Sequence, residues 1–264
     1  MNSVPAFSVV VPLRDEEPNV MPFYEELTRA LPPGAAPYEV IFVEDGSSDR
    51  TFAILSTIQL ADPRVRVIRL TRNFGQTAAF AAGFAHAKGR FIVTIDGDLQ
   101  NDPADIPRLL ALARDYDVVC GWRKERKDAY LTRYVPAAIA NRLLGLVSGV
   151  RIHDNGCSLK VFRAEVVKPL KLRPGSHRYL PALASQLGSR VTEVPVNHRP
   201  RQFGQSKYGL SRTFKVIADL MRLRGLMREA VDPHADVPRL YEIATILPPF
   251  AEGAEIAEVS RRDR

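Results

Sequence analysis

The sequence predicts an α/β fold with a mostly parallel, Rossmann-like sheet flanked by helices. Short apolar segments rich in β-branched residues alternate with longer segments of helical spacing through the first half of the 264-residue chain. Three of the apolar segments run directly into acidic residues, often next to glycine, which is typical of strand ends at the carboxyl edge of a sheet. An amphipathic helical extension is expected near the C-terminus.

Five strands are predicted in the first half, because five short runs are apolar on both faces, as in strands covered by helices on two sides. They span Phe7–Leu13, Tyr38–Asp45, Val65–Thr71, Arg90–Asp96 and Asp117–Trp122. The spacing of apolar residues predicts four helices between and after these strands. The helices span Pro18–Leu31, Asp49–Ala61, Gly75–Lys88 and Pro103–Arg114.

The second half of the chain is less regular. A helix is predicted over Leu131–Val150, and further strands over Cys157–Arg163 and Val191–Asn197. A basic loop, His198–Gly209, precedes the amphipathic segment Ser211–Glu229, which could lie in an anionic membrane surface or pack on the domain. We expect partial helix and a frayed terminus over the remaining segment, Val231–Arg264.

Charge and cysteine content restrict the partners and the compartment. The net charge is +7 and the isoelectric point about 9.6, which favours anionic partners such as phosphate groups, nucleotides or an acidic membrane surface. Nucleic acid is not expected, because the basic residues lack interleaved stacking aromatics. Cys120 and Cys157 lie in apolar stretches and are interpreted as buried thiols in a reducing compartment. No apolar run reaches the roughly 18–20 residues that span a bilayer.

Acidic residues at the strand ends predict a cation site. Asp96 and Asp98 flank Gly97 where the fourth strand stops, so both carboxylates, together with the Gln100 amide oxygen, can face one hard cation. Oxygen ligands of this kind suit Mg²⁺ or Mn²⁺. The alternative is a turn that caps a helix, which explains either acidic motif alone equally well. The order and the placement of the motifs together favour the cation site.

A basic loop supplies candidate phosphate ligands. Arg199, Arg201 and Lys207 are interleaved with Gly204 and Gly209, so the backbone can fold round an anion. A solvated basic loop is the alternative reading. Charge alone favours neither reading. The position of the loop after the last core strand favours phosphate binding when it is taken together with the family resemblance described below.

Six motifs occur in an order that is characteristic of one enzyme family. They lie at Val9–Val20, Glu39–Thr51, Arg72–Gly83, Thr94–Pro103, Asp154–Arg163 and Arg201–Tyr208. In these motifs, over residues 5–225, the chain resembles the family 2 glycosyltransferases of GT-A fold. Within that family it looks like the dolichyl-phosphate mannose synthases and the bacterial polyprenyl-phosphate glycosyltransferases.

The resemblance implies a role for each matching residue. The nucleotide pocket would be lined by Pro12, Glu16 and Asp45. The metal and the donor diphosphate would be held by Asp96, Asp98 and Gln100. The donor or acceptor phosphate would be contacted by Arg123 and Arg133. Phosphate would be clamped from a mobile loop by Arg201, Ser206 and Lys207. The catalytic residues would be Asp98 and Asp154, the latter near the transferred sugar.

The chain departs from the family pattern in three respects. Arg14 stands where the family often has an aromatic residue, and Glu44 where it often has Asp; both changes bear on which base is accepted. Many relatives carry transmembrane helices after the motif that ends at Tyr208, and none is expected here.

The resemblance implies an inverting, metal-dependent hexosyltransferase that uses a UDP- or GDP-sugar and a polyprenyl phosphate. A catalytic domain would span residues 1–210, followed by an amphipathic helix and tail over residues 211–264. The expected location is cytoplasmic and peripheral on the inner face of the membrane, with a membrane subunit or homo-oligomer as further partners. The alternatives are a soluble hydroxyl acceptor, with Asp154 as general base, and a non-catalytic nucleotide-sugar-binding subunit.

Overall fold

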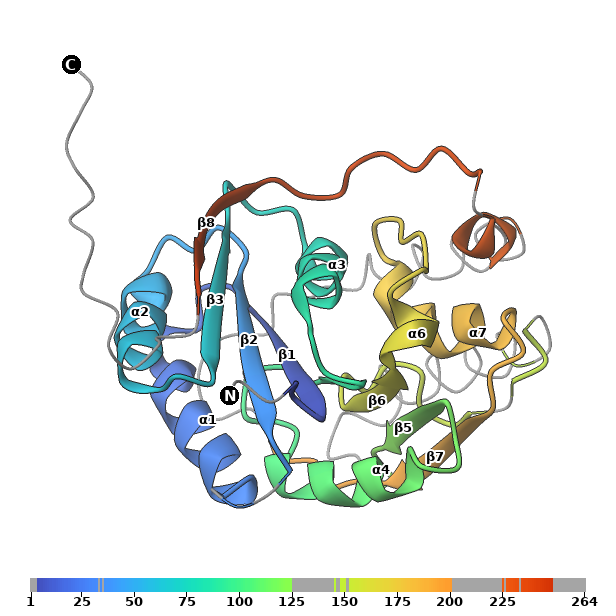
Figure 1. Ribbon diagram of the computed structural model, residues 1–264, viewed down its shortest axis with the longest axis horizontal. Coiled ribbons are helices and arrows are strands. Elements are labelled where there is room, and N and C mark those ends of the chain that lie inside the picture. Colours follow the sequence, from blue (N-terminus) through green and yellow to red (C-terminus); the bar gives the residue numbers. More distant parts are fainter. Residues whose placement is uncertain are drawn as a thin grey trace.

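Figure 1 shows the chain in a computed structural model, which describes residues 4–124, 145–200 and 225–248 except positions 33, 35, 146, 147, 151, 226 and 233. The strands are β1 Phe7–Leu13, β2 Tyr38–Glu44, β3 Val65–Leu70, β4 Phe91–Thr94, β5 Val118–Trp122, β6 Lys160–Arg163, β7 Val191–Pro195 and β8 Ile243–Leu247. The helices are α1 Glu17–Ala30, α2 Thr51–Ala61, α3 Gln76–His86, α4 Ile106–Leu112, α6 Ala164–Val167 and α7 Leu180–Ser185. Two 3-10 turns are η1 Pro103–Asp105 and η3 Ser176–Tyr179.

The described strands form one mixed sheet in the order β7-β5-β6-β4-β1-β2-β3-β8. Strands β1 to β4 run parallel, as do β5 and β7, whereas β6 runs antiparallel between β4 and β5. Lys160 at the start of β6 therefore lies opposite Thr94 near the end of β4 and opposite Cys120 near the end of β5. The loop before β6 thus meets the loops after the parallel strands at one edge. The predicted α/β architecture is confirmed.

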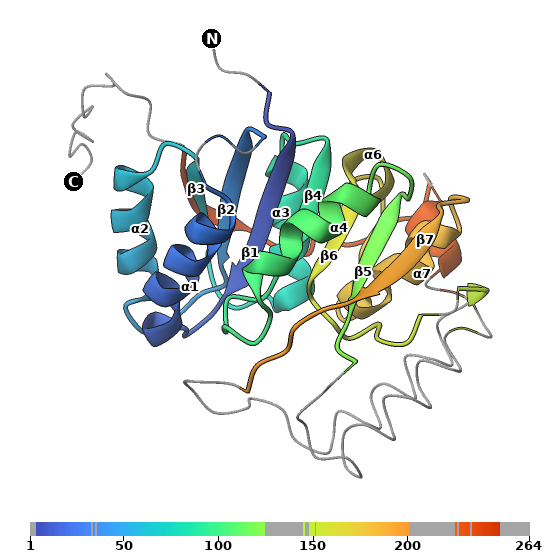
Figure 2. The same cartoon turned by 90° about the horizontal axis from the view of Figure 1, so that it is seen from below.

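Helices cover both faces of the sheet, with α1, α2 and α4 on one side and α3, α6 and α7 on the other (Figures 1 and 2). Alternate residues of each strand point to opposite faces of the sheet. Val10 and Ile41 pack toward α3, and Val9 and Phe42 pack toward α1. This two-sided burial explains why the strands are apolar throughout.

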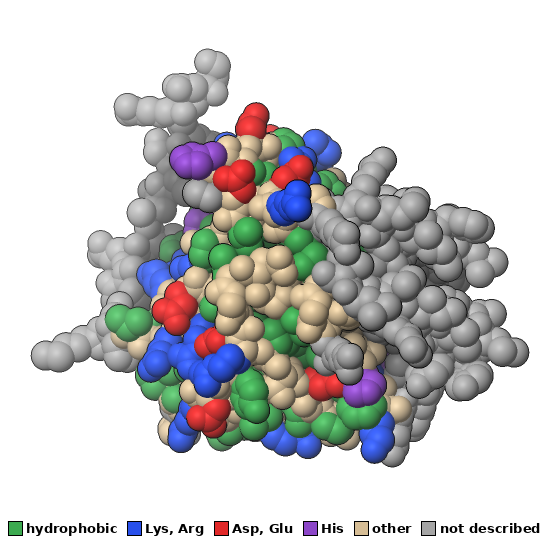
Figure 3. Space-filling view, turned by 90° about the vertical axis from the view of Figure 1, so that its right-hand side faces the viewer, with side chains coloured by type: hydrophobic (Ala, Val, Ile, Leu, Met, Phe, Trp, Pro, Cys, Tyr) green, Lys and Arg blue, Asp and Glu red, His purple; other side chains and the backbone are tan. Residues whose placement is uncertain are grey.

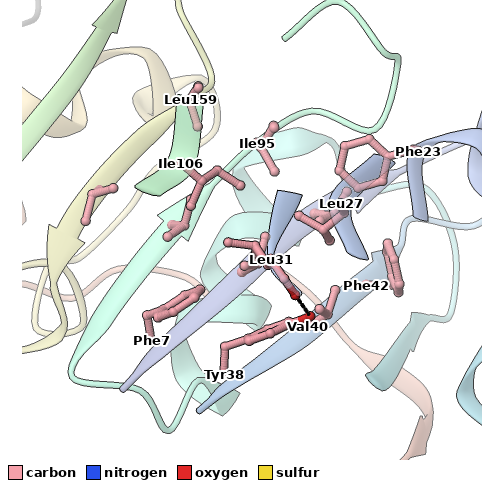
Figure 4. Close-up of a cluster of buried hydrophobic side chains, with 14 of the residues drawn as sticks. Phe7, Phe23, Leu27, Leu31, Tyr38, Val40, Phe42, Ile95, Ile106 and Leu159 are labelled. Atoms are coloured by element: carbon pink, nitrogen blue, oxygen red, sulfur yellow. Dashed lines mark hydrogen bonds between the residues drawn. The ribbon is translucent and has the colours of Figure 1, made fainter. Parts of the chain in front are cut away.

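Aromatic side chains fill the layer beneath α1 (Figure 4). Phe23 meets Phe42 edge to face at 6.5 Å, and Leu27 packs in the same cluster. The Tyr38 hydroxyl donates a hydrogen bond of 2.8 Å to the Leu31 carbonyl, which satisfies a polar group at the end of α1. Burying each such aromatic ring contributes about 1.5–3 kcal/mol.

The turn after β2 requires glycine. Gly46 has a φ of +65°, and a Cβ atom there would lie 2.4 Å from the backbone carbon of Arg72. Only glycine fits both the left-handed backbone and this approach. The loop after β2 and the loop after β3 can therefore touch.

The C-terminal segment differs from the prediction. Instead of partial helix alone, Val231–Arg264 contains β8, which pairs antiparallel with β3. The Thr71 amide also donates to the Glu242 carbonyl at 3.0 Å. Helix occurs at residues 227–231, whereas the frayed terminus and most of Leu131–Val150 and Ser211–Glu229 lie outside the described residues. No helix in the described ranges is both long and apolar enough to cross a membrane.

Acidic and basic side chains are intermixed on the face shown in Figure 3, around an uncharged central area. The described part of this face therefore does not concentrate the net positive charge in one patch.

An ion pair fixes the turn between α2 and β3. Buried Asp62 accepts hydrogen bonds from the Arg64 guanidinium at 2.7 and 2.9 Å and from the Tyr24 hydroxyl at 2.8 Å. Burial alone would raise the pKa of Asp62, but the bonds from Arg64 and Tyr24 outweigh burial and lower it. Burial and the bond to Asp62 raise the pKa of Tyr24 to about 12.

We predict that Asp62→Asn lowers the free energy of unfolding near pH 7 by about 2 kcal/mol, because charge-assisted hydrogen bonds are lost. Because folding lowers the pKa of Asp62, its carboxylate stabilises the fold fully at pH values above 3.8, the ordinary aspartate pKa. This stabilisation is lost as the pH falls through the folded-state pKa. Urea unfolding followed by circular dichroism at a series of pH values measures the difference. Asp115→Asn, at an exposed site, serves as the control. A difference that persists undiminished at pH 2 would contradict the assignment.

Candidate active site

Two neighbouring carboxylates follow β4 at the edge where the loops meet. Asp98 is buried and Asp96 partly buried, on either side of Gly97. Burial and the adjacent charge of Asp98 raise the pKa of Asp96 to about 6. Leu99, which is 1% exposed, adopts a φ of +62°, an uncommon backbone conformation for a leucine, directly after these two acids.

This donor set fits a hard divalent cation. Two repelling carboxylates in a poorly solvated place are stabilised by a positive ion between them. No cluster of three or more His, Cys, Asp or Glu side chains suited to a metal occurs in the described part of the chain. Mg²⁺ needs no such cluster, because it is commonly bound through one or two carboxylates plus water and substrate phosphates. Gln100 lies in the same loop, and its backbone amide donates a hydrogen bond of 3.2 Å to the Asp98 carboxylate.

Side chains from two other loops hold Asp96. The Gln76 amide at the start of α3 donates to its carboxylate at 2.6 Å. Ser158 accepts hydrogen bonds from the Asp96 backbone amide at 3.1 Å and from the Asn101 side chain at 2.9 Å. The sequence did not single out Gln76 or Ser158, although both lie within the recognised motifs. The only indication of their role in the sequence is that both are polar residues inside these motifs.

Arg123 and Asp154 form a bidentate ion pair. Nε and Nη2 of Arg123 lie 2.7 and 3.0 Å from the two carboxylate oxygens of Asp154. Both side chains are largely buried, at 13% and 4% exposed. A Cβ at Gly156 would stand 3.3 Å from Arg123, so a small residue there leaves room for the guanidinium. The predicted neighbours of phosphate and sugar are thus brought together, and each is bound to the other.

A buried lysine lies beneath these acids and was missed in the sequence. Lys160 is 3% exposed, and its ammonium donates to the carbonyls of Asn155, at 3.1 Å, and Cys157. Its charge and that of Arg123 counter the rise in the pKa of Asp96. Lysines are almost never fully buried unless paired. Lys160 therefore braces the loop that carries Asp154 and acts on Asp96 through its charge.

Asp45 positions a loop. Its two carboxylate oxygens accept the backbone amides of Phe74 and Gly75 at 2.7 and 2.8 Å, immediately before α3. Burial raises the pKa of Asp45. Pro12 on β1 and Glu16 in the following loop lie at the same edge of the sheet.

The basic loop begins at a fixed anchor. Arg199 pairs with Glu26 at 2.7 Å and Asp102 at 2.6 Å, and its amide donates to the Gln100 carbonyl at 2.8 Å. Its guanidinium was expected to meet phosphate; instead it binds two carboxylates and ties the loop to the chain after β4. The remaining predicted phosphate ligands, Arg133, Arg201, Ser206 and Lys207, lie outside the described residues.

Comparison with known proteins identifies relatives of the chain. Residues 8–170 match the family model described as Glycosyl transferase family 2. The chain is 44% identical over 231 residues to dodecaprenyl-phosphate galacturonate synthase of Rhizobium johnstonii, covering 86% of this chain and 68% of that protein. It is 37% identical over 216 residues to undecaprenyl-phosphate 4-deoxy-4-formamido-L-arabinose transferase of Edwardsiella ictaluri, covering 81% and 66%. The chain thus spans about two thirds of the length of each relative.

Solved structures share the fold. Glucosyl-3-phosphoglycerate synthase from Mycobacterium tuberculosis, in complex with Mn²⁺, uridine-diphosphate and phosphoglyceric acid, aligns with a TM-score of 0.64 at 18% identity, covering 93% of this chain and 90% of that one. A mannosyltransferase from Pyrobaculum calidifontis, in complex with GDP-Man and Mn²⁺, aligns with a TM-score of 0.56 at 16% identity, covering 87% and 74%. At these identities the similarity establishes the fold alone.

We predict that Lys160→Met lowers the melting temperature of the metal-free protein by roughly 6 °C, because two backbone carbonyls lose their donor at a cost of about 2 kcal/mol. Mn²⁺ should then raise the melting temperature of the variant more than that of the wild type, because the internal cation no longer repels the ion. Differential scanning calorimetry over a range of Mn²⁺ concentrations measures both effects.

Lys168→Met is the matched control, because Lys168 also donates to a backbone carbonyl, that of Ala87, away from the acids. Its response to Mn²⁺ should equal that of the wild type. An equal response in Lys160→Met would show that Lys160 does not act on the cation site.

Proposed function

Because the chain belongs to the family 2 glycosyltransferases and has their GT-A fold, we propose that it transfers a sugar from a nucleotide-diphosphate donor to a polyprenyl phosphate. The observation that carries this proposal is the convergence of Asp96 and Asp98 with the Arg123–Asp154 pair at one edge of the sheet. The names of both relatives, which contain dodecaprenyl phosphate and undecaprenyl phosphate, support a polyprenyl acceptor.

The donor would bind across the ends of β1, β2 and β4. Pro12, Glu16 and Asp45 would line the nucleotide pocket, Asp45 by holding the loop before α3 in place. Asp96 and Asp98, with the Gln100 amide, would hold Mg²⁺ or Mn²⁺, which neutralises charge on the departing nucleoside diphosphate.

The acceptor phosphate is already anionic near neutral pH, so the reaction needs positioning more than a strong base. A phosphate oxygen forms the new bond to the anomeric carbon as the bond from that carbon to the diphosphate oxygen breaks on the opposite face, which inverts the configuration. Arg123 and Arg133 would guide the phosphates. The pairing of both Asp154 oxygens with Arg123 supports an orienting role for Asp154 over that of a general base for a hydroxyl acceptor.

The basic loop and the segment after it would complete the acceptor site. Arg201, Ser206 and Lys207 would clamp phosphate, starting from the anchor at Arg199. The amphipathic residues 211–229 would lie against an anionic membrane surface, where a polyprenyl chain is held. The enzyme would then act at the inner face of the membrane, alone, as a homo-oligomer or with a membrane subunit.

The donor sugar need not be a plain hexose. The relatives' names specify galacturonate, a uronic acid, and a formamido derivative of arabinose, a pentose. The hexose expected from the sequence is therefore one member of a wider donor class.

An assay matrix tests the proposal. Purified protein is incubated with Mg²⁺ or Mn²⁺, undecaprenyl phosphate in detergent, and a panel of UDP- and GDP-sugars that includes uronic acids and amino-pentoses. Release of nucleoside diphosphate that requires both the lipid phosphate and the metal is the expected result. Release of nucleoside diphosphate that does not depend on lipid would indicate a soluble acceptor instead. No release with any donor of the panel would favour a non-catalytic binding subunit.

We predict that Asp98→Asn reduces lipid-dependent release at least roughly 100-fold, because the variant loses a charged ligand for the cation beside the leaving group. The fold should persist, since removal of one of two repelling carboxylates relieves strain. Turnover and circular dichroism are measured together. Asp115→Asn, at the opposite end of the sheet, should match the wild type. Retained activity in Asp98→Asn would exclude Asp98 as a metal ligand.

A further inference from the structure

One arginine near the candidate active site has no partner in the described part of the molecule. Arg178 lies in η3, is partly buried, and forms no hydrogen bond or ion pair with any described residue. Its Nε atom in particular is buried without a hydrogen-bond partner among those residues. Sequence reasoning did not single out this residue.

The segment that carries Arg178 is fixed beside the carboxylates. The preceding residue, His177, has its Nδ1 atom 2.7 Å from the Thr77 hydroxyl, and the Gly175 amide donates to the same hydroxyl at 2.9 Å. Thr77 follows Gln76, whose amide holds Asp96. η3 therefore contacts α3 at the end that faces the cation site, and α7, which follows η3, reaches β5.

Three other described arginines of this region form ion pairs. Arg123 binds Asp154, Arg199 binds Glu26, and Arg173, five residues before Arg178, binds Glu229 at 2.5 Å. The Nε atom of Arg178 is buried without a compensating acceptor, which costs free energy in the folded chain. An anion that arrives with the substrate supplies that acceptor, and the planar guanidinium matches a carboxylate or a phosphate through two parallel bonds.

We propose that Arg178 binds an oxyanion of the substrate beside the Asp96–Asp98 cation site. This inference rests on the proposed function, because it assigns the oxyanion to the donor sugar or to a substrate phosphate. The two sources present the same chemistry: a uronic-acid donor carries a carboxylate on its sugar ring, and the acceptor lipid carries a phosphate. Arg178 then determines whether the enzyme prefers the charged over the neutral form of that substrate.

Matched ligand pairs test the assignment by isothermal titration calorimetry in the presence of Mg²⁺. The first pair is UDP-galacturonate and UDP-galactose, which differ in the sugar carboxylate. The second pair is farnesyl phosphate and farnesol in detergent, which differ in the phosphate. Wild type, Arg178→Gln, Arg178→Lys and Arg173→Gln are compared, the last removing a paired arginine from the same segment.

We expect the wild type to prefer the charged member of one pair and Arg178→Gln to lose roughly 10-fold to 100-fold of that preference. The pair that loses its preference identifies the source of the oxyanion. Arg178→Lys should recover part of it, because it keeps the charge without the bidentate geometry. Arg173→Gln should keep the preference of the wild type.

Thermal melting separates this role from a structural one. Because Arg178 lacks a described partner, Arg178→Gln should melt at or above the temperature of the wild type. A lower melting temperature, or preferences in Arg178→Gln equal to those of the wild type, would overturn the assignment, as would a wild type that prefers neither charged ligand. Loss of preference in a protein that transfers no sugar in the assay matrix would uphold the oxyanion site and reject only the proposed transfer.

Discussion

Carboxylates held at one edge of the sheet organise the site, because each one is bound by a group from a different loop. Asp45 accepts hydrogen bonds from the backbone amides that precede α3, and Asp96 accepts one from the Gln76 side chain. Asp154 forms a bidentate ion pair with Arg123. Negative charges gathered in this way repel one another, and these hydrogen-bond donors offset part of that repulsion. The loops are consequently positioned by the same acids that would meet the substrate.

The departures from the family pattern have a structural meaning. Glu44 is fully buried, and its carboxylate accepts hydrogen bonds from the Ser47 amide and, at 3.1 Å, from Arg69. Arg14 lies 3.4 Å from Asp15, whose own carboxylate reaches the loop after β2. Both residues therefore help to fix the loop after β1 against the loop after β2. An effect of either residue on base selection would act through the relative position of these two loops.

Local patterns in the sequence predicted the parallel half of the sheet well. The bounds of β1 agree with the prediction, and the other predicted strands of the first half differ by a few end residues, because burial on both faces leaves a continuous apolar signature. The acids in the loops were predicted to cluster because the carboxyl ends of parallel strands lie at one edge of the sheet. Lys160 was missed because a single cation in an apolar strand carries no periodic signal. β8 was missed because its partner, β3, is distant in sequence, and such pairing depends on tertiary contacts that local propensity does not report.

The pairing of β8 with β3 also orders events during synthesis. Of the described strands β8 is translated last, so β3 leaves the ribosome with one row of backbone donors and acceptors unmatched. An open apolar edge of this kind recruits strands of other nascent chains and is a target for chaperones. β3 gains its second neighbour only after β7 and the segment that follows it have been made. The outer strand on this side of the sheet is then β8, which has five residues, and a short edge strand offers few backbone groups to other chains.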